Sequence, residues 1–236
     1  MNYLIANLVT AYEPQTEEFA SFLAPFACEA EREADITLRF SREQTEALLK
    51  RMTADTTFAQ AESFGVGDRF NRAVIRFHAM LVHSSAIVCD GKAYLFSAAS
   101  GVGKSTHTRL WLRQFGDRVH IMNDDKPVVR LYEDEVIVHG TPFDGGSGIA
   151  LNESYPLGAI VFVERGEHNS VRVPTDAEVI QNLYFQTAHM VGAKTAEMML
   201  ENFDLLIGRA RFYVLTCNME PEAAVVAYRA IIHSEM

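Results

Sequence analysis

The chain contains little cysteine and only one tryptophan. Its three cysteines, Cys28, Cys89 and Cys217, are odd in number and lie far apart in 236 residues. They lack the short spacing of a zinc site, and an odd, scattered set argues against a disulfide framework. Such cysteine usage is typical of a reducing compartment, so we expect a cytoplasmic protein.

Positive charge is also scarce. The 21 Lys and Arg residues against 31 Asp and Glu residues give a formal net charge of −10. A negative surface argues against non-specific binding to nucleic acid or to an anionic membrane, so neither is expected as a partner. Seven acids accompany a single base, Arg32, between Glu13 and Asp35. Such a run is typical of a solvated face, and the alternative is a docking surface for a basic partner.

Long hydrophobic runs are missing. The apolar run 157–163 is far too short to span a bilayer, and the first residues lack the basic region of a signal peptide. No internal repeat and no low-complexity tract interrupts the chain. With 48% hydrophobic residues, a chain of this length can form one large domain, or one domain with an appendage.

The most informative stretch is residues 98–105, Ala-Ala-Ser-Gly-Val-Gly-Lys-Ser, between a predicted strand over 92–97 and a predicted helix over 106–115. The first N–H groups of a helix have no partner inside it and carry partial positive charge, so small residues there can wrap a phosphate. Lys104 can reach the outer phosphates of a nucleotide, and Ser105 can present its hydroxyl to Mg²⁺. The predicted nucleotide-binding residues are Ser100, Gly101, Val102, Gly103, Lys104, Ser105 and Thr106.

One position departs from the usual phosphate-loop pattern. Ala98 stands where glycine is expected, which costs about 1 kcal/mol if the residue must adopt a positive φ and nothing if its φ is negative. The alternative interpretation of the whole stretch is a turn rich in glycine and serine that binds no ligand.

The pattern of residues 1–65 predicts a small α+β region, and we expect it to pack on a core formed by residues 66–236. A capping box, Ser41 to Gln44, marks one helix start. Gly65 and Gly67 are interpreted as a turn. The expected strands are 3–10, 35–40 and 57–64, and the expected helices are 16–26, 42–52 and 68–78.

The rest predicts a mixed α/β core with mixed sheets and flanking helices. Segments 81–89 and 92–97 form a predicted hairpin across Asp90-Gly91, which is a strong turn signal. A strand that feeds a phosphate loop from a hairpin departs from the doubly wound nucleotide fold. Further strands are expected over 119–122, 127–132, 135–139, 157–164, 170–173 and 211–217, helices over 175–188, 193–209 and 221–232, and a glycine-rich loop over 140–151.

Two further features belong with the loop if phosphate is transferred here. Asp124-Asp125 ends a predicted strand 20 residues after Lys104. One carboxylate there can hold Mg²⁺ with the loop hydroxyl, and the other can accept a proton from an attacking hydroxyl. His83 lies on the strand antiparallel to the one that feeds the loop, so it is expected near the loop. The alternatives are a solvated turn for the aspartates and a structural role for the histidine.

Taken together, these residues resemble a known family. The run 100–105, a histidine 21 residues before the lysine and a downstream Asp-Asp pair resemble the HPr kinase/phosphorylase family. The segment 83–86, His-Ser-Ser-Ala, is also similar to the stretch before the loop in ATP-dependent phosphoenolpyruvate carboxykinases. Segment 140–146 resembles a further loop of small members of this superfamily. The resemblance covers roughly residues 80–165 and implies a phosphoenolpyruvate carboxykinase-like P-loop core.

The resemblance implies an ATP- and Mg²⁺-dependent kinase that transfers the γ-phosphate to a hydroxyl, in particular a serine of a small protein or peptide. It implies that Lys104 contacts the outer phosphates and that His83 sits close to the transferred group. Ser105 and one aspartate, Asp124 or Asp125, would hold Mg²⁺, and Asp124 is our choice for the general base. The Pro-Val-Arg-Pro loop and the N-terminal domain of the HPr kinases are not found in the sequence.

Several alternatives stay open at this stage. The protein could be a non-catalytic nucleotide-binding regulator, or a small-molecule kinase or carboxykinase-like enzyme, and the nucleotide could be GTP or be replaced by pyrophosphate. A homo-oligomer is compatible with the sequence. Lys126, Arg130 and Arg165 are the candidates for neutralising the migrating phosphoryl group. Trp111 is expected in the core and His107 at the surface.

Overall fold

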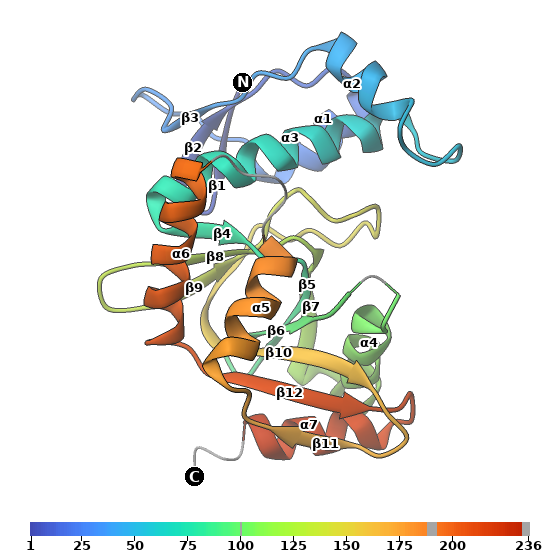
Figure 1. Ribbon diagram of the computed structural model, residues 1–236. Helices are drawn as coiled ribbons and strands as arrows, with labels where there is room; N and C mark the ends of the chain where they lie inside the picture. The colour runs from blue at the N-terminus through green and yellow to red at the C-terminus, as the bar shows by residue number, and fades with distance from the viewer. Residues whose placement is uncertain (100, 188–192, 233–236) are drawn as a thin grey trace.

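The computed structural model describes residues 1–99, 101–187 and 193–232 and has a mixed α/β fold, which confirms the predicted class. Within those residues a three-stranded sheet is built from the N-terminal region, and a larger nine-stranded sheet is built from the rest of the chain. Figure 1 shows the N-terminal sheet and helices at one end of the molecule, next to strands β4 and β8 of the larger sheet.

The N-terminal region begins with a hairpin, not with the single strand expected over 3–10. Ala6 and Asn7 form the turn with φ of 53° and 58°, so the chain reverses there. The capping box at Ser41 is confirmed and starts the second helix. The elements are β1 (Asn2–Ile5), β2 (Leu8–Ala11), α1 (Glu17–Leu23), β3 (Ile36–Thr37), α2 (Arg42–Leu49) and α3 (Phe58–Val74).

The strand predicted over 57–64 is wrong, because these residues open helix α3. Thr57 and Gln60 form a second capping box: the Thr57 hydroxyl accepts from the Gln60 N–H at 3.1 Å, and the Gln60 side chain accepts from the Thr57 N–H at 2.8 Å. These two bonds satisfy N–H groups that a helix start leaves unpaired, so they favour the helix locally.

The turn predicted at Gly65 and Gly67 is wrong for a related reason, since both glycines lie inside α3. A Cβ atom at Gly65 would lie 2.2 Å from Cζ of Phe40. The glycine is therefore there to let a neighbouring ring approach the helix closely. As a result α3 runs without a break across residue 65, where the sequence places the end of the N-terminal region.

The larger sheet follows the order β4-β8-β9-β10-β6-β5-β7, and β12 joins β10 to β11. The predicted hairpin is confirmed as β5 and β6, with positive φ at both Asp90 and Gly91. The strands are β4 (Ala79–Leu81), β5 (Ser84–Cys89), β6 (Lys92–Ser97), β7 (Val119–Asp125), β8 (Val128–Leu131), β9 (Val136–His139), β10 (Ser154–Arg165), β11 (Ser170–Arg172) and β12 (Phe212–Cys217).

Helices cover both faces of this sheet. Successive strand residues point to opposite faces, and the buried side chains of β5 divide accordingly. Ala86 and Val88 pack with residues of α5 and α6, whereas Ile87 and Cys89 pack with residues of α4 and α7. These helices are α4 (Lys104–Phe115), α5 (Asp176–Thr187), α6 (Ala193–Ile207) and α7 (Glu222–Ile231), and the predicted end of the α5 segment at Ala188 lies outside the described residues.

His107 is not at the surface as expected but is 2% exposed in the core under α4. The indole N–H of Trp111, which is buried as predicted, donates to His107 Nε2 at 2.9 Å. That bond requires an unprotonated Nε2, and burial lowers the pKa of His107 to about 4. Helix α4, which follows the glycine loop, therefore places a neutral histidine of its own against Phe96 of β6.

This neutral histidine predicts acid sensitivity. Between pH 6.5 and 4 the unfolded chain binds a proton at His107 that the folded chain does not, so the free energy of unfolding should fall as the pH drops. The loss should reach about 3 kcal/mol near pH 4. Urea unfolding of the wild type and a His107→Gln variant at both ends of this range measures it. An equal pH dependence in the two proteins would contradict the assignment.

No helix in the described ranges is both long and apolar enough to cross a membrane.

Candidate active site

The pairing of β5 places the predicted site residues at one edge of the sheet. β5 runs antiparallel to both β6 and β7, and its first residue, Ser84, lies opposite Ser97 on one side and Asp125 on the other. The start of β5 therefore meets the ends of β6 and β7. His83, which immediately precedes β5, and the loop that follows β6 are brought to the same place, as the sequence predicts.

The loop itself has the backbone that its glycines allow. Gly101 and Gly103 have φ of 77° and 126°, conformations that favour glycine, and α4 begins directly after Gly103. Ala98 does not have a positive φ, so alanine introduces no strain there. Its carbonyl instead accepts a hydrogen bond from Lys104 Nζ at 3.0 Å. Ser100, predicted to bind nucleotide, lies outside the described residues.

Arg165, at the end of β10, forms hydrogen bonds to the backbone of the glycine loop. Its guanidinium donates to the carbonyl of Val102 at 3.0 Å and to the carbonyl of Gly101. Val102, predicted to bind nucleotide, is partly buried against the core under α4 and does not line the phosphate pocket described below. Arg130 donates to the carbonyl of Ala6 at 2.7 Å, in the N-terminal hairpin, so it is not part of this site.

A pocket of about 360 Å³, here called the phosphate pocket, opens beside the start of α4. It collects most of the residues predicted from the sequence together with three from the glycine-rich loop that the prediction missed. Its lining residues are His83, Gly101, Gly103, Lys104, Ser105, Thr106, Asp124, Asp125, Asp144, Gly145 and Ser147.

Ser105 and Asp124 form the oxygen-rich side of the phosphate pocket. The Ser105 hydroxyl donates to Asp124 Oδ1 at 3.0 Å. Asp124 is only 7% exposed, and its backbone is fixed by an N–H bond to the Ile149 carbonyl and by a bond from the Ser147 hydroxyl to its own carbonyl. A hydroxyl and a carboxylate are the oxygen ligands that Mg²⁺ prefers, so this pair fits that cation.

Within the described parts of the chain, no group of three or more His, Cys, Asp or Glu side chains converges on a metal site. Mg²⁺ bound together with a nucleotide takes one or two carboxylates and completes its shell with phosphate oxygens and water.

Asp125 lines the same pocket but contacts a different set of side chains. Its Oδ1 lies 3.3 Å from His83 Nε2, and its Oδ2 lies 3.2 Å from Lys126 Nζ. Burial by itself would raise the pKa of Asp125, but the hydrogen bond from His83 and the charge of Lys126 outweigh burial and lower that pKa. Asp125 is therefore a carboxylate at neutral pH, held between two nitrogen groups.

His83 links this carboxylate to the loop lysine. Its Nδ1 lies 3.0 Å from Oε1 of Gln186, and its Nε2 lies 3.1 Å from Lys104 Nζ as well as near Asp125. With a proton on Nδ1, a neutral ring accepts from Lys104, and a doubly protonated ring donates to Asp125. Burial lowers the pKa of Lys104, against the opposing effect of Asp125 and Asp124.

Sequence reasoning missed Gln186 because it lies on α5, 103 residues from His83, and carries no local motif. It also missed Asp144, although the run Asp144-Gly145-Gly146 was visible. The buried Asp144 carboxylate accepts from the Gly146 N–H at 3.0 Å and the Gly148 N–H at 2.6 Å, which shapes the loop. A Cβ atom at Gly145 would lie 2.8 Å from Cγ of Asp125, so the loop backbone packs directly on that carboxyl.

No protein-family model matches the chain, and no curated protein matches it. Among solved structures, the HPr(Ser) kinase/phosphatase from Coxiella burnetii is similar over 66% of this chain and 99% of its own. The two chains are 10% identical over the aligned part, and the TM-score is 0.41.

Proposed function

We propose that this protein is an ATP- and Mg²⁺-dependent phosphotransferase that acts on a hydroxyl group. The observation that carries the proposal is the Ser105–Asp124 pair, 3.0 Å apart, beside Lys104 at the N-terminus of α4. A helix N-terminus, a lysine and an oxygen pair of this kind bind a triphosphate and its cation together.

The nucleotide's outer phosphates lie at the first N–H groups of α4, and Lys104 turns from the Ala98 carbonyl to contact them. Ser105 and Asp124 hold the cation, which when bound would supply positive charge against the β- and γ-phosphates. Lys126 stands beside Asp125 and, of the three candidate cations, is the one that remains for the migrating group, since Arg165 holds the loop and Arg130 lies elsewhere.

Asp125 receives the acceptor hydroxyl. The hydroxyl oxygen forms a bond to the γ-phosphorus while the bond from that phosphorus to the β–γ bridging oxygen breaks, so that the nucleoside diphosphate leaves with the bridging oxygen. The hydroxyl proton passes to the Asp125 carboxylate. The sequence favoured Asp124 as the base, but the bond from Ser105 engages Asp124 with the loop, and Asp125 is the carboxylate beside His83 and Lys126. We therefore assign the base role to Asp125.

We propose a serine of a small protein or peptide as the acceptor. Incubation with γ-labelled ATP and Mg²⁺, with serine peptide pools in one series and metabolite pools in another, tests the function. We expect labelled product that depends on both ATP and Mg²⁺. Unlabelled GTP and pyrophosphate as competitors identify the preferred phosphoryl donor. ATP binding without transfer to either pool would favour a nucleotide-binding regulator, and no ATP binding at millimolar concentration would refute the proposal.

A further inference from the structure

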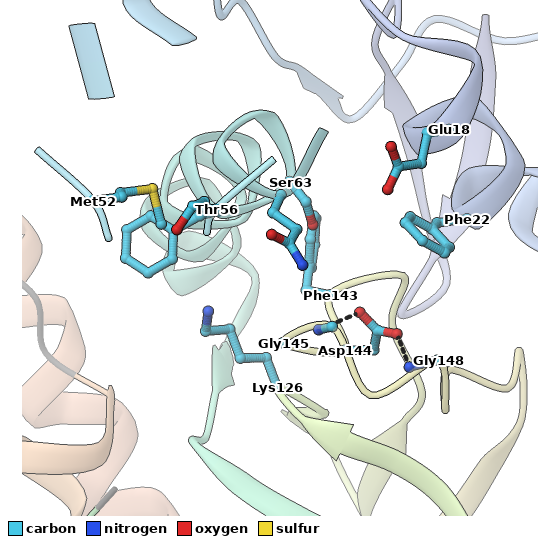
Figure 2. A pocket seen from close by; sticks show the side chains of 13 residues that line it. Glu18, Phe22, Met52, Thr56, Ser63, Lys126, Phe143, Asp144, Gly145 and Gly148 are labelled. Atoms are coloured by element: carbon cyan, nitrogen blue, oxygen red, sulfur yellow. Dashed lines mark hydrogen bonds between the residues drawn. The ribbon is translucent and has the colours of Figure 1, made fainter. Parts of the chain in front are cut away.

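A second pocket, here called the N-terminal pocket, lies directly against the phosphate pocket. It has a volume of about 370 Å³ and shares Asp144 and Gly145 with its neighbour. Figure 2 shows Glu18 and Phe22 on one side of it and Met52 and Thr56 on another, with Lys126 and the glycine-rich loop below them. The N-terminal region thus supplies much of its wall.

The wall of this pocket borders the proposed base, which itself lines the phosphate pocket. Lys126 lines it, and the Nζ atom of Lys126 is 3.2 Å from Asp125 Oδ2. Gly145, on the shared wall, packs against the Asp125 carboxyl group. A hydroxyl placed at the wall that the two pockets share would therefore lie next to Asp125 and beside a γ-phosphate in the phosphate pocket.

Resting on the proposed function, we infer that the N-terminal pocket receives the acceptor and that this acceptor is a serine on a flexible, basic peptide segment. A volume of about 370 Å³ falls within the size of sites that enclose small ligands. It holds a serine with a neighbouring side chain and excludes a folded domain, so the serine must lie on a segment that can enter without its own fold.

The preference for a basic segment follows from the charges that face the pocket. Three charged side chains line it: Glu18, Lys126 and Asp144. Lys126 is neutralised by Asp125, and the Asp144 carboxylate accepts two backbone N–H bonds within its loop. Within the described residues, the exposed Glu18 carboxylate makes no hydrogen bond and no ion pair. Its uncompensated negative charge favours a lysine or arginine beside the serine.

The walls around Glu18 suit the stem of such a side chain. Phe22 and Met52 are half-buried, and Phe143 is buried behind them. Lysine and arginine pack their methylene groups on apolar surface while their charged ends stay near an acid or water. Glu17, exposed next to Glu18 in the first turn of α1, adds a second negative charge on that helix.

Another pocket borders His83 and Lys126 and offers a competing path for the acceptor. It is larger, about 520 Å³, and is lined by the exposed rings of Phe64, Tyr184 and Phe185. It shares His83 with the phosphate pocket but neither Asp144 nor Gly145. An acceptor bound there would depend on Tyr184 and not on Glu18, so the two paths are separable by mutation.

Synthetic peptides with one central serine, flanked by Lys and Arg, by Glu or by Ala, provide the probes in a transfer assay with γ-labelled ATP and Mg²⁺. We expect the basic set to be preferred over the acidic set at least about 10-fold in kcat/KM. Glu18→Lys should remove or reverse that preference while leaving ATP affinity unchanged. Glu29→Lys makes the same charge change within the same acidic run but outside the pocket, and it should keep the preference.

Three results would overturn the inference without touching the proposed function: ATP-dependent transfer with no basic preference, loss of the preference in Tyr184→Ala but not in Glu18→Lys, or transfer to small amino alcohols and not to peptides. Absence of ATP binding in the wild type is a different failure, since it would remove the proposed function itself. Nucleotide affinity is therefore measured first, by calorimetry with ATP and Mg²⁺ and no acceptor present.

Discussion

Replacing Lys104 with methionine is expected to weaken ATP–Mg²⁺ binding by roughly 100-fold. Lys104 is the charged side chain at the start of α4, is 9% exposed, and lies within reach of the phosphates that the loop would hold. A charge-assisted bond in a partly buried site contributes up to about 3 kcal/mol, which is about two factors of ten in affinity. Methionine keeps the length and apolar stem of the side chain, so the effect reports the charge.

Calorimetric titration of ATP into the wild type, Lys104→Met and a Lys50→Met control measures this. Lys50 is exposed at the end of α2, outside the glycine loop. The Lys50→Met substitution therefore removes the same charge without changing the loop. The control should bind as the wild type does, and unfolding curves should show that all three proteins are folded. Equal affinities for the wild type and Lys104→Met would mean that the nucleotide, if it binds, does not use this loop.

Replacing Asp125 with asparagine should slow phosphoryl transfer by a factor on the order of 1,000 and leave ATP affinity nearly unchanged. A general base contributes about 10² to 10⁴ in rate, and an amide cannot accept the proton. Asp124→Asn, the matched variant on the neighbouring residue, should behave differently. It should raise the Mg²⁺ concentration needed for half-maximal transfer, because Ser105 then lacks its carboxylate partner.

Single-turnover transfer rates over a series of Mg²⁺ concentrations distinguish the two roles. If Asp124→Asn abolished transfer at saturating Mg²⁺ while Asp125→Asn only shifted the Mg²⁺ dependence, the roles would be exchanged, and the choice of Asp124 as base made from the sequence would hold.

The sequence could predict the presence of this site but not the division of labour within it. The strand, the glycine loop and the helix follow one another along the chain, so their arrangement can be predicted from consecutive residues. The roles of Asp124 and Asp125 depend on which side chains each carboxylate meets. That is set by the pairing with β5, where Ser85 lies opposite Asp124 and Ser84 opposite Asp125 beyond a register shift at residues 86 and 87. No local pattern shows that shift.

In the N-terminal region too, contacts between distant segments decide a structure that the local sequence does not predict. Thr57 and Gln60 repeat the capping pattern of Ser41 and Gln44, which favours a helix. The two glycines that follow favour a turn in the sequence alone. Only the structure shows that Gly65 is needed because the ring of Phe40 packs against it. The first half of helix α3 and the pocket that it lines were therefore missed, whereas the helix predicted over 68–78 covers its second half. Gln186 and Glu18 reach their places only through contacts between segments far apart in the sequence.

The central claim is that a triphosphate and its cation bind at the N-terminus of α4. A crystal structure with Mg²⁺ and a non-hydrolysable ATP analogue tests it most directly. The account predicts the β- and γ-phosphates against the N–H groups of residues 103–106, Lys104 Nζ moved from the Ala98 carbonyl onto them, and the cation between Ser105 and Asp124. Phosphates bound elsewhere, with Lys104 still bonded to Ala98 and His83, would contradict it.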